Sequence, residues 1–397
     1  MADARQLSGT ELAAALRDSR RRTLSLVDDL TAAQWSPPRQ TGINPVAWEL
    51  AHLAWFAEFW ILRGPHHRDL QGFAQAQHRP RFSGPDALFD SARLTHAERW
   101  TEAMPSRAEL RTMLSGQLDA CIQAISPASG DSGRAQDPLY FHRLALFHED
   151  MHGEAFCWMR AALGYPAPQR IQAPQVFTSR PLTVRGADVR IGYGGTDTGF
   201  AFDNECPLQS VGLRDFEIDS APLSAGKFAA FVEAGGYDAP AYWPSDSGVW
   251  RAQSECAHPR RWRRTPQADW EMLWFDQWVP LDPSAPAMHL NAFEAEAYCL
   301  WARRRLPTAS EWEYAAQTQT GFQWGRSVWE WTSNDFAPYP GFKPGPYLEY
   351  SLPWFGAHRE LRGGAFATHA RIHNPRYRNF FQPHRNDVFA GFRTVAL

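Results

Sequence analysis

The first half of this chain is organised around one stretch, Phe147-His148-Glu149-Asp150-Met151-His152-Gly153-Glu154-Ala155-Phe156. Apolar residues recur in and around it at the three- and four-residue spacing of a helix that packs against other helices. His148 and His152 are four residues apart, so on a helix they share one face, about 6 Å apart along the axis. Two such imidazoles can share one metal ion if a third ligand comes from elsewhere. Taken alone, the pattern fits two histidines on a helix surface equally well.

Composition limits the classes of function. A chain of 397 residues is long enough for two domains, and 44% hydrophobic and 21% charged residues are typical of a soluble globular protein. A net charge of -3 indicates no nucleic-acid or anionic-membrane partner. The N-terminus has no apolar targeting segment, and no apolar run is long enough to span a membrane. Five scattered cysteines without a CxxC pair indicate free thiols in a reducing cytoplasm.

Helical periodicity and proline spacing predict two domains. Helical segments are expected at 9–31, after Asn44-Pro45, at about 106–125 and at about 137–163. The proline-spaced stretch 164–175 marks a boundary, so we expect a four-helix bundle over residues 1–165. Residues 166–397 have short β-like runs with helices expected at 291–304 and 310–318. The fold class is therefore α+β.

His52 lies in the middle of the second, strongly apolar helical segment. A lone histidine there is more often a core residue, but His148 and His152 on a facing helix change that balance, because bundles build ligand sites from inward-pointing side chains. Three imidazoles can hold one metal and leave positions open for catalysis. Imidazole suits iron, zinc, copper and nickel alike, so the spacing does not name the metal. Glu154 faces nearly the opposite side of its helix and is interpreted as a supporting carboxylate.

These motifs resemble those of a known enzyme family. His52 with the pair His148 and His152 and the following Glu154 is similar to the DinB-like N-terminal domain of the ergothioneine-pathway sulfoxide synthases. The second half resembles the formylglycine-generating-enzyme fold, related to C-type lectins, that these synthases carry. Its matching segments are 305–316, 328–333, 361–366 and 389–393. Each segment alone identifies only a widely used fold, whereas their combination with the three histidines is specific.

The resemblance implies a mononuclear non-haem Fe(II) enzyme with O2 as co-substrate. In that family the metal binds hercynine (trimethyl-histidine) and a sulfur donor, and sulfur is joined to imidazole C2 with oxidation to the sulfoxide. By position, Asn379, Phe380 and Phe381 would line the hercynine pocket, where an aromatic face near the quaternary ammonium contributes roughly 1 to 2 kcal/mol; a strand core is the alternative. Tyr347 matches the family's proton-donating tyrosine, with Tyr350 as its structural rival.

Three departures from the family pattern concern the substrates. Met151 stands at the hercynine pocket where some members have a glutamine, and Phe381 stands where the branch that uses γ-glutamylcysteine has an aspartate for the donor's amino group. The arginine-rich donor stretch of that branch is replaced by residues 90–100. Carboxylates are costly to bury unpaired. The remaining candidates for binding those of a donor are Arg93, Arg99 and Arg385.

The chain is thus more similar to the selenoneine synthases, relatives that join a selenosugar to hercynine. The alternative is a hercynine sulfoxide synthase that uses cysteine or γ-glutamylcysteine, and both imply small-molecule partners. A formylglycine-generating oxidase is a rival, but its aerobic form needs a cysteine pair near the chain's end, and no cysteine follows Cys299. A three-His thiol transferase would do without the second domain, and a lectin-like binding module would leave the histidines without a role.

Overall fold

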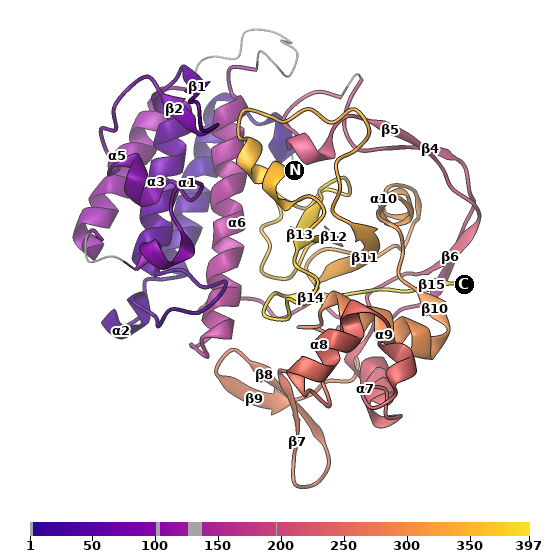
Figure 1. Cartoon of the computed structure of the whole chain (residues 1–397). Coiled ribbons are helices and arrows are strands. Elements are labelled where there is room, and N and C mark those ends of the chain that lie inside the picture. Colours follow the sequence, from indigo (N-terminus) through magenta and orange to yellow (C-terminus); the bar gives the residue numbers. More distant parts are fainter. Residues whose placement is uncertain (1–2, 101–103, 126–136, 196) are drawn as a thin grey trace. The chain divides into compact units, whose positions relative to one another are not determined.

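The computed structural model describes residues 3–100, 104–125, 137–195 and 197–397. The chain forms two compact units (Figure 1): unit 1 comprises Met1–Gln169 with Thr196–Ala201, and unit 2 comprises Arg170–Gly195 with Phe202–Leu397. Unit 1 is mainly helical, whereas unit 2 combines helices with short strands, which confirms the α+β class. Across the described ranges, no helix is both long and apolar enough to cross a membrane.

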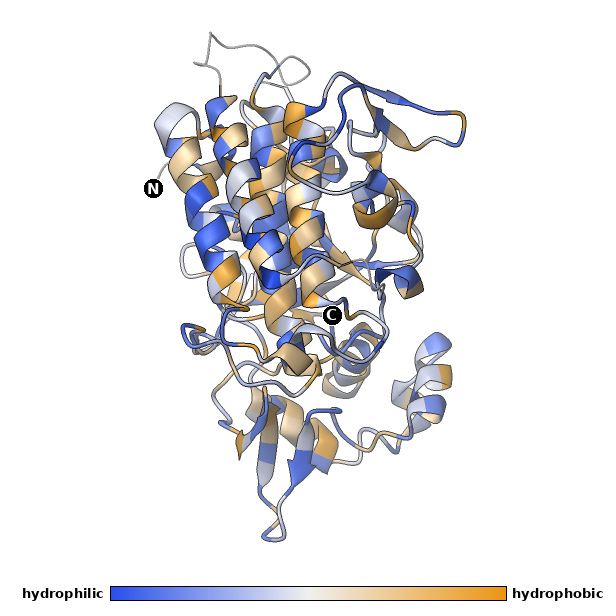
Figure 2. Cartoon of the chain, turned by 90° about the vertical axis from the view of Figure 1, so that its left-hand side faces the viewer, coloured by the Kyte–Doolittle hydropathy of each residue, from blue (hydrophilic) through white to orange (hydrophobic). Residues whose placement is uncertain are grey.

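Within the described residues, four long helices lie side by side in unit 1 (Figure 1). They are α1 (Gly9–Ser25), α3 (Val46–Leu62), α5 (Arg107–Gln123) and α6 (Tyr140–Ala162). The shorter elements are α2 (Ala32–Trp35), α4 (Asp86–Phe89), two 3-10 turns (Ala4–Gln6 and His96–Arg99), and the antiparallel pair β1 (His66–Arg68) and β2 (Ala74–Ala76). Helix α3 packs against α5 and α6, and α1 packs against α6. Figure 2 colours the chain by hydropathy and shows hydrophobic and hydrophilic residues mixed on several of these helices.

Helix α3 is apolar on nearly every side, and a helix of that kind lies in a protein interior. Two carboxylates interrupt it: Glu49 is 2% exposed and Glu58 is 0% exposed. Glu58 accepts hydrogen bonds from the backbone N–H groups of Arg81 and Ser83, at 2.5 and 2.7 Å, and from the Ser83 hydroxyl at 2.6 Å. These bonds attach the segment after β2 to α3. Glu49 belongs to the site described below.

Buried polar contacts with α1 set the rotation of α6 about its axis. Arg20 donates to both carboxylate oxygens of Glu149, at 2.7 and 3.1 Å. The hydroxyl of Ser19 donates to Asp150 at 2.7 Å. Because these two acidic residues face α1, the helical repeat turns the histidines on either side of them toward another helix.

The first helix is shorter than the predicted range 9–31. Helix α1 ends at Ser25, and α2 begins after Thr31, which forms a capping box with Gln34. The turn between them is fastened by Asp29, whose carboxylate accepts two hydrogen bonds from Arg160 of α6, at 2.7 and 2.8 Å. The apolar spacing of residues 9–31 therefore continues across a turn, which is held by contacts with α6 and not by the local sequence.

Residues from beyond position 195 also belong to unit 1. The backbone N–H of Phe200 donates to the carbonyl of Arg5 at 2.8 Å. The ring of Phe200 packs on those of Tyr140 and Phe147, with 5.2 Å between centroids in each case. Unit 1 is therefore built from two separate pieces of sequence.

Unit 2 contains two four-stranded sheets among its described residues, with strand orders β10-β15-β6-β3 and β13-β12-β11-β14. Their strands are β3 (Pro181–Val184), β6 (Phe216–Asp219), β10 (Arg304–Arg305), β11 (Trp329–Asp335), β12 (Arg359–Gly363), β13 (Asn379–Phe381), β14 (Ala390–Gly391) and β15 (Val395–Ala396). Smaller sheets pair β4 (Asp188–Ile191) with β5 (Gln209–Gly212), and β8 (Trp270–Trp274) with both β7 (Trp262–Arg264) and β9 (Gln277–Pro280). Short 3-10 turns cover Asp203–Glu205, Pro240–Tyr242, Leu348–Tyr350 and Leu352–Trp354.

The helices of unit 2 include two that the sequence did not reveal. Those expected are α9 (Ala292–Ala302) and α10 (Ala309–Thr318); those missed are α7 (Ala225–Glu233) and α8 (Asp246–Ser254). Each missed helix has nine residues, too few for a helical repeat to be distinguished from a loop.

Buried ion pairs hold the second sheet together. Glu330 of β11 is fully buried and accepts hydrogen bonds from Arg393 and from the indole of Trp312, the latter at 3.0 Å. Arg378, immediately before β13, donates to Glu360 of β12 at 2.7 Å. A buried charge is tolerated when it is paired and hydrogen-bonded in this way. The second pair fixes the position at which β13 begins.

Candidate metal centre

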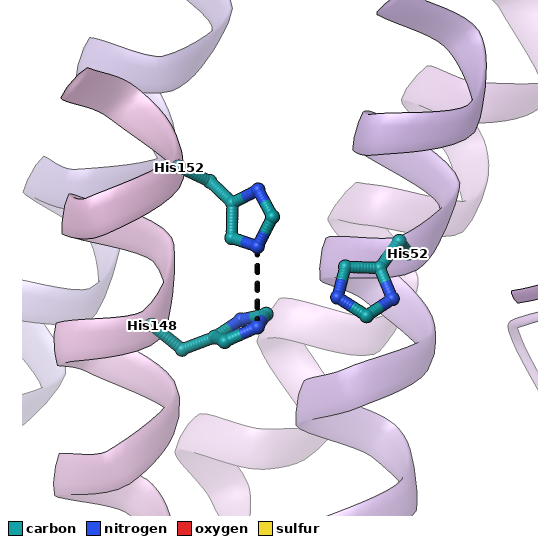
Figure 3. Close-up of side chains that lie close together, drawn as sticks. All are labelled: His52, His148 and His152. Atoms are coloured by element: carbon teal, nitrogen blue, oxygen red, sulfur yellow. Dashed lines mark hydrogen bonds between the residues drawn. The ribbon is translucent and has the colours of Figure 1, made fainter. Parts of the chain in front are cut away.

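Three histidines converge between two helices of unit 1. His52 of α3 and His148 and His152 of α6 turn their rings toward one another (Figure 3). One ring nitrogen of each lies within 4.8 Å of the other two, and the Nε2 atoms of His148 and His152 are 3.2 Å apart. His52 and His148 are buried, whereas His152 is partly exposed. The three-His cluster expected from the spacing is therefore present.

Two of the imidazoles have a fixed partner on Nδ1. Nδ1 of His52 donates to the carbonyl of Phe89 at 2.7 Å, and Nδ1 of His152 lies 2.5 Å from carboxylate oxygen Oε2 of Glu49. A carbonyl or carboxylate on Nδ1 holds the proton there and leaves the Nε2 lone pair for a metal. The donor set therefore fits a divalent transition metal, which three neutral imidazoles bind well.

Aromatic rings cover two of the three imidazoles. Phe56 stacks on His148 with 3.6 Å between centroids and 8° between planes. Trp48 stacks on His52 at 5.0 Å and 8°. These contacts exclude water from the two rings and restrict their rotation.

Burial also determines the charge of the site. It lowers the pKa of His52 to about 3, with a further contribution from His152, and lowers the pKa of His148 well below its usual range. Burial disfavours the charged form of Glu49, but His152 and a hydrogen bond from Asn44 outweigh it and lower the pKa of Glu49 to about 2. At neutral pH, His52 and His148 are therefore neutral and Glu49 is ionised. Neutral imidazole is the form that binds metals.

Glu49 is the site residue that sequence reasoning missed. Its signal was a carboxylate three residues before His52 in an otherwise apolar helix, where a buried charge needs a partner. Glu154, to which the sequence assigned the supporting role, is buried two residues after His152. That role of Glu154 stays a prediction.

The residues expected at the hercynine pocket form β13 of unit 2. Leu361 and Glu360 of β12 pair with Asn379 and Phe380 in an antiparallel register. The ring of Phe380 stacks on Phe336, with 4.1 Å between centroids and 14° between planes, so one of its faces is already covered. A contact of β13 with hercynine stays a prediction.

The expected proton donor, Tyr347, also lies in unit 2. It is partly buried and directly precedes the 3-10 turn that contains Tyr350. The two rings are 6.4 Å apart. The hydroxyl of Tyr350 lies 3.0 Å from that of Tyr377, and burial raises the pKa of Tyr350 well above its usual range. The hydroxyl of Tyr350 is thus engaged with a neighbouring side chain, and the choice of Tyr347 over Tyr350 as proton donor stays a prediction.

Two of the expected donor-binding arginines already form ion pairs. Arg93 donates to Asp90 at 3.0 Å and to the carbonyl of Ala74 at 2.9 Å. Arg385 forms two hydrogen bonds of 2.6 Å with Asp387. Each guanidinium would have to leave or share its carboxylate in order to bind a donor.

The other two predicted residues lie in unit 1. Arg99 donates to Asn44 at 2.9 Å, and its guanidinium lies 4.3 Å from the ring centroid of Trp48. Met151 is partly exposed on α6, one residue before His152. Binding of substrates by either residue stays a prediction.

Comparison with known proteins finds relatives for both parts of the chain. The Sulfatase-modifying factor enzyme 1-like domain matches residues 173–328 and 325–396, and the DinB superfamily matches residues 15–156. The hercynine oxygenase of Mycolicibacterium thermoresistibile is 29% identical over an alignment of 452 positions that covers 96% of this chain and 94% of that protein. The hercynine oxygenase of Mycobacterium tuberculosis is 28% identical over an alignment of 449 positions that covers 97% of this chain and 98% of that protein. Ergothioneine biosynthesis protein 1 of Schizosaccharomyces pombe is 23% identical over 58% of this chain and 33% of its own length.

Proposed function

Since this chain belongs to the family of the sulfatase-modifying factor enzyme 1-like domain and is similar over nearly its whole length to two hercynine oxygenases, we propose that it acts on hercynine with O2. It is an enzyme of the oxidoreductase type. The proposed reaction joins imidazole C2 of hercynine to a chalcogen donor, as in ergothioneine-type sulfoxide synthases.

The convergence of His52, His148 and His152 carries this proposal. Three imidazole nitrogens in a water-poor setting suit Fe(II). When bound there, Fe(II) would supply the one-electron chemistry with O2 that an oxygenase requires. A lectin-like binding protein would have no use for such a cluster, because its ligands bind without a redox-active metal.

The atoms of the proposed reaction balance as follows. The C2–H bond of hercynine and the S–H or Se–H bond of the donor break, and a carbon–chalcogen bond forms. One atom of O2 ends on the chalcogen as an oxide, and the other leaves as water with the two hydrogens. Tyr347 is proposed to donate a proton, because a phenol can do so without carrying a charge into a dry pocket. Asn379, Phe380, Phe381 and Met151 are proposed to hold hercynine.

For the donor we propose a selenosugar, with cysteine or γ-glutamylcysteine as the alternatives. The supporting observation is that Arg93 and Arg385 are paired with aspartates and Arg99 is hydrogen-bonded to an amide. A donor with two carboxylates would need such cations for itself, since buried unpaired charges are costly. A neutral sugar can pair its hydroxyls with neutral groups and rest on an aromatic face.

The test is an aerobic assay of the Fe(II)-loaded protein with hercynine and, in parallel, cysteine, γ-glutamylcysteine and a selenosugar. The expected product has the mass of hercynine plus donor, less two hydrogens and plus one oxygen. Histidine in place of hercynine and His52→Ala in place of the native protein are the controls. Absence of this product with every donor would overturn the proposed function.

A further inference from the structure

The polar residues behind His152 form a connected series of contacts. Oε2 of Glu49 lies 2.5 Å from Nδ1 of His152, and Oε1 of the same carboxylate accepts a hydrogen bond from Nδ2 of Asn44 at 2.8 Å. Oδ1 of Asn44 in turn accepts a hydrogen bond from the guanidinium of Arg99 at 2.9 Å. Four residues are thus linked end to end: one from α6, one from α3, one from the segment before α3 and one from the 3-10 turn His96–Arg99.

The series returns to the site on its other side. The guanidinium of Arg99 lies over Trp48, 4.3 Å from the ring centroid, and Trp48 stacks on the imidazole of His52. Two histidines on different helices are therefore supported by one set of contacts that passes through Arg99.

The hydrogen-bonding roles in this series are determined by chemistry. A guanidinium can only donate and a carboxylate can only accept, so the amide of Asn44 between them has one possible orientation. Its NH2 group occupies Oε1 of Glu49, and Oε2 is the carboxylate oxygen that lies 2.5 Å from Nδ1 of His152. With Nδ1 facing Glu49, Nε2 of His152 lies on the side of the ring that faces His148, 3.2 Å from its Nε2.

We infer that Glu49 is the positioning residue of the metal centre, holding His152 in its metal-binding orientation, and that Asn44 and Arg99 hold Glu49 in place. The inference rests on the proposed function, because it requires the three histidines to bind a metal. It assigns Arg99 to the support of the metal centre instead of to the carboxylate of a donor.

Glu49→Gln tests the inference in the full-length protein. Glutamine keeps the size of the side chain but has a single acceptor oxygen, so either Asn44 or His152 then faces an NH2 group. We expect the Kd for Co(II), measured by competition with a chromophoric chelator, to rise by about 10- to 100-fold. The visible ligand-field spectrum of the Co(II) protein should change as well, because His152 is no longer held in one orientation.

Glu58→Gln is the matched control. Glu58 lies on the same helix, is equally buried and accepts several hydrogen bonds, but its partners lie in the segment 81–83 and include none of the histidines. This variant should lose thermal stability while its Co(II) affinity stays within about twofold of the native value and its spectrum is unchanged.

Three outcomes would overturn the inference. Native Co(II) affinity and spectrum in Glu49→Gln would show that the carboxylate does not position His152. Equal weakening in Glu58→Gln would show a general effect of packing. If Glu49→Gln does not fold, Asn44→Ala replaces it; this variant keeps the carboxylate but removes its anchor, and unchanged Co(II) binding would again overturn the inference. A native protein that binds no Co(II) would instead overturn the metal centre itself, so the two failures are distinguishable.

Discussion

Arg20 of α1 and Glu149 of α6 form a buried ion pair with two hydrogen bonds, next in sequence to His148. Each side chain is 6% exposed. Arg20→Met would leave the carboxylate buried without its partner, so we expect the free energy of unfolding to fall by about 3 to 5 kcal/mol. Urea denaturation followed by tryptophan fluorescence measures this loss.

The control for that prediction is the exposed pair between Arg111 and Asp28, whose side chains are 58% and 46% exposed. Arg111→Met should change the free energy of unfolding by less than about 1 kcal/mol, because solvent screens a surface pair. If both methionine variants lose the same small amount, the pair between α1 and α6 does not stabilise the bundle.

Replacing any one of His52, His148 or His152 by Ala should abolish tight Fe(II) binding and turnover, since two imidazoles hold a metal far less well than three. The helical circular-dichroism signal should persist. His142→Ala is the matched control: His142 is also buried on α6, but its Nε2 donates to the carbonyl of Cys121 at 3.0 Å. Full iron occupancy in His52→Ala would exclude the three-His site.

Leu at Phe380 or Phe381 should weaken the binding of hercynine more than that of histidine. A quaternary ammonium gains roughly 1 to 2 kcal/mol from a desolvated aromatic face, and an α-ammonium that keeps its own hydrogen bonds depends on that face less. Isothermal titration of each variant with both ligands gives the comparison. Equal losses of affinity for hercynine and histidine would show that these rings only pack against other side chains, as Phe380 does against Phe336.

Turnover with a selenosugar should exceed turnover with γ-glutamylcysteine by at least about 10-fold in kcat/KM. The reason is that Arg93 and Arg385 are already paired with aspartates, so the charges of γ-glutamylcysteine would be buried without full partners. Such burial would weaken its binding by ~3 kcal/mol. Steady-state assays with hercynine in excess measure the ratio. Comparable kcat/KM values would favour the alternative, a hercynine sulfoxide synthase that uses a thiol donor. Arg93, Arg99 and Arg385 would then be the first residues to replace in a search for the donor site.

A buried carboxyl in unit 2 should make stability depend on pH. Burial raises the pKa of Glu294 from 4.5 to about 7, against hydrogen bonds from Tyr237 and Asn291. The folded chain therefore binds this proton more tightly than the unfolded chain, so stability falls as pH rises from about 4.5 to 7, by about 3 kcal/mol in total. Glu294→Gln should remove this part of the pH dependence in urea denaturation at pH 5 and pH 8. Identical pH dependence in both proteins would contradict it.

Helical spacing was sufficient to predict part of the three-histidine cluster. His148 and His152 share a helix face whatever surrounds them, and the start of α3 after Pro45 could be read from the proline itself. The end of α1 could not be predicted in this way. The helix ends at Ser25, and the turn that follows is held by the contact of Asp29 with Arg160, 131 residues away. A helix boundary set by so distant a partner leaves no local signal.

The support of the cluster was hidden for the same reason. Glu49 was visible as a buried carboxylate, but its partner His152 lies on another helix. Arg99 was predicted to bind a donor because arginines bind carboxylates, and this stays a prediction. Its hydrogen bond to Asn44, 55 residues away in the sequence, could not be predicted from the local pattern. The type of a charged residue indicates which groups it can pair with, whereas the partner that it has in the folded chain is known only from the structure.

The position of Phe200 in unit 1 has a consequence for dividing the polypeptide. No single cut in the backbone releases an intact first unit, because a fragment that stops at Gln169 lacks the ring that covers Phe147 and Tyr140. Phe200 lies inside the span 173–328 that matches the sulfatase-modifying factor enzyme 1-like domain, yet its ring packs on Phe147, the residue before His148. Exchange of either half with a relative would therefore have to transplant residues 197–201 together with α6, or the helix that carries two of the three histidines would lose part of its packing.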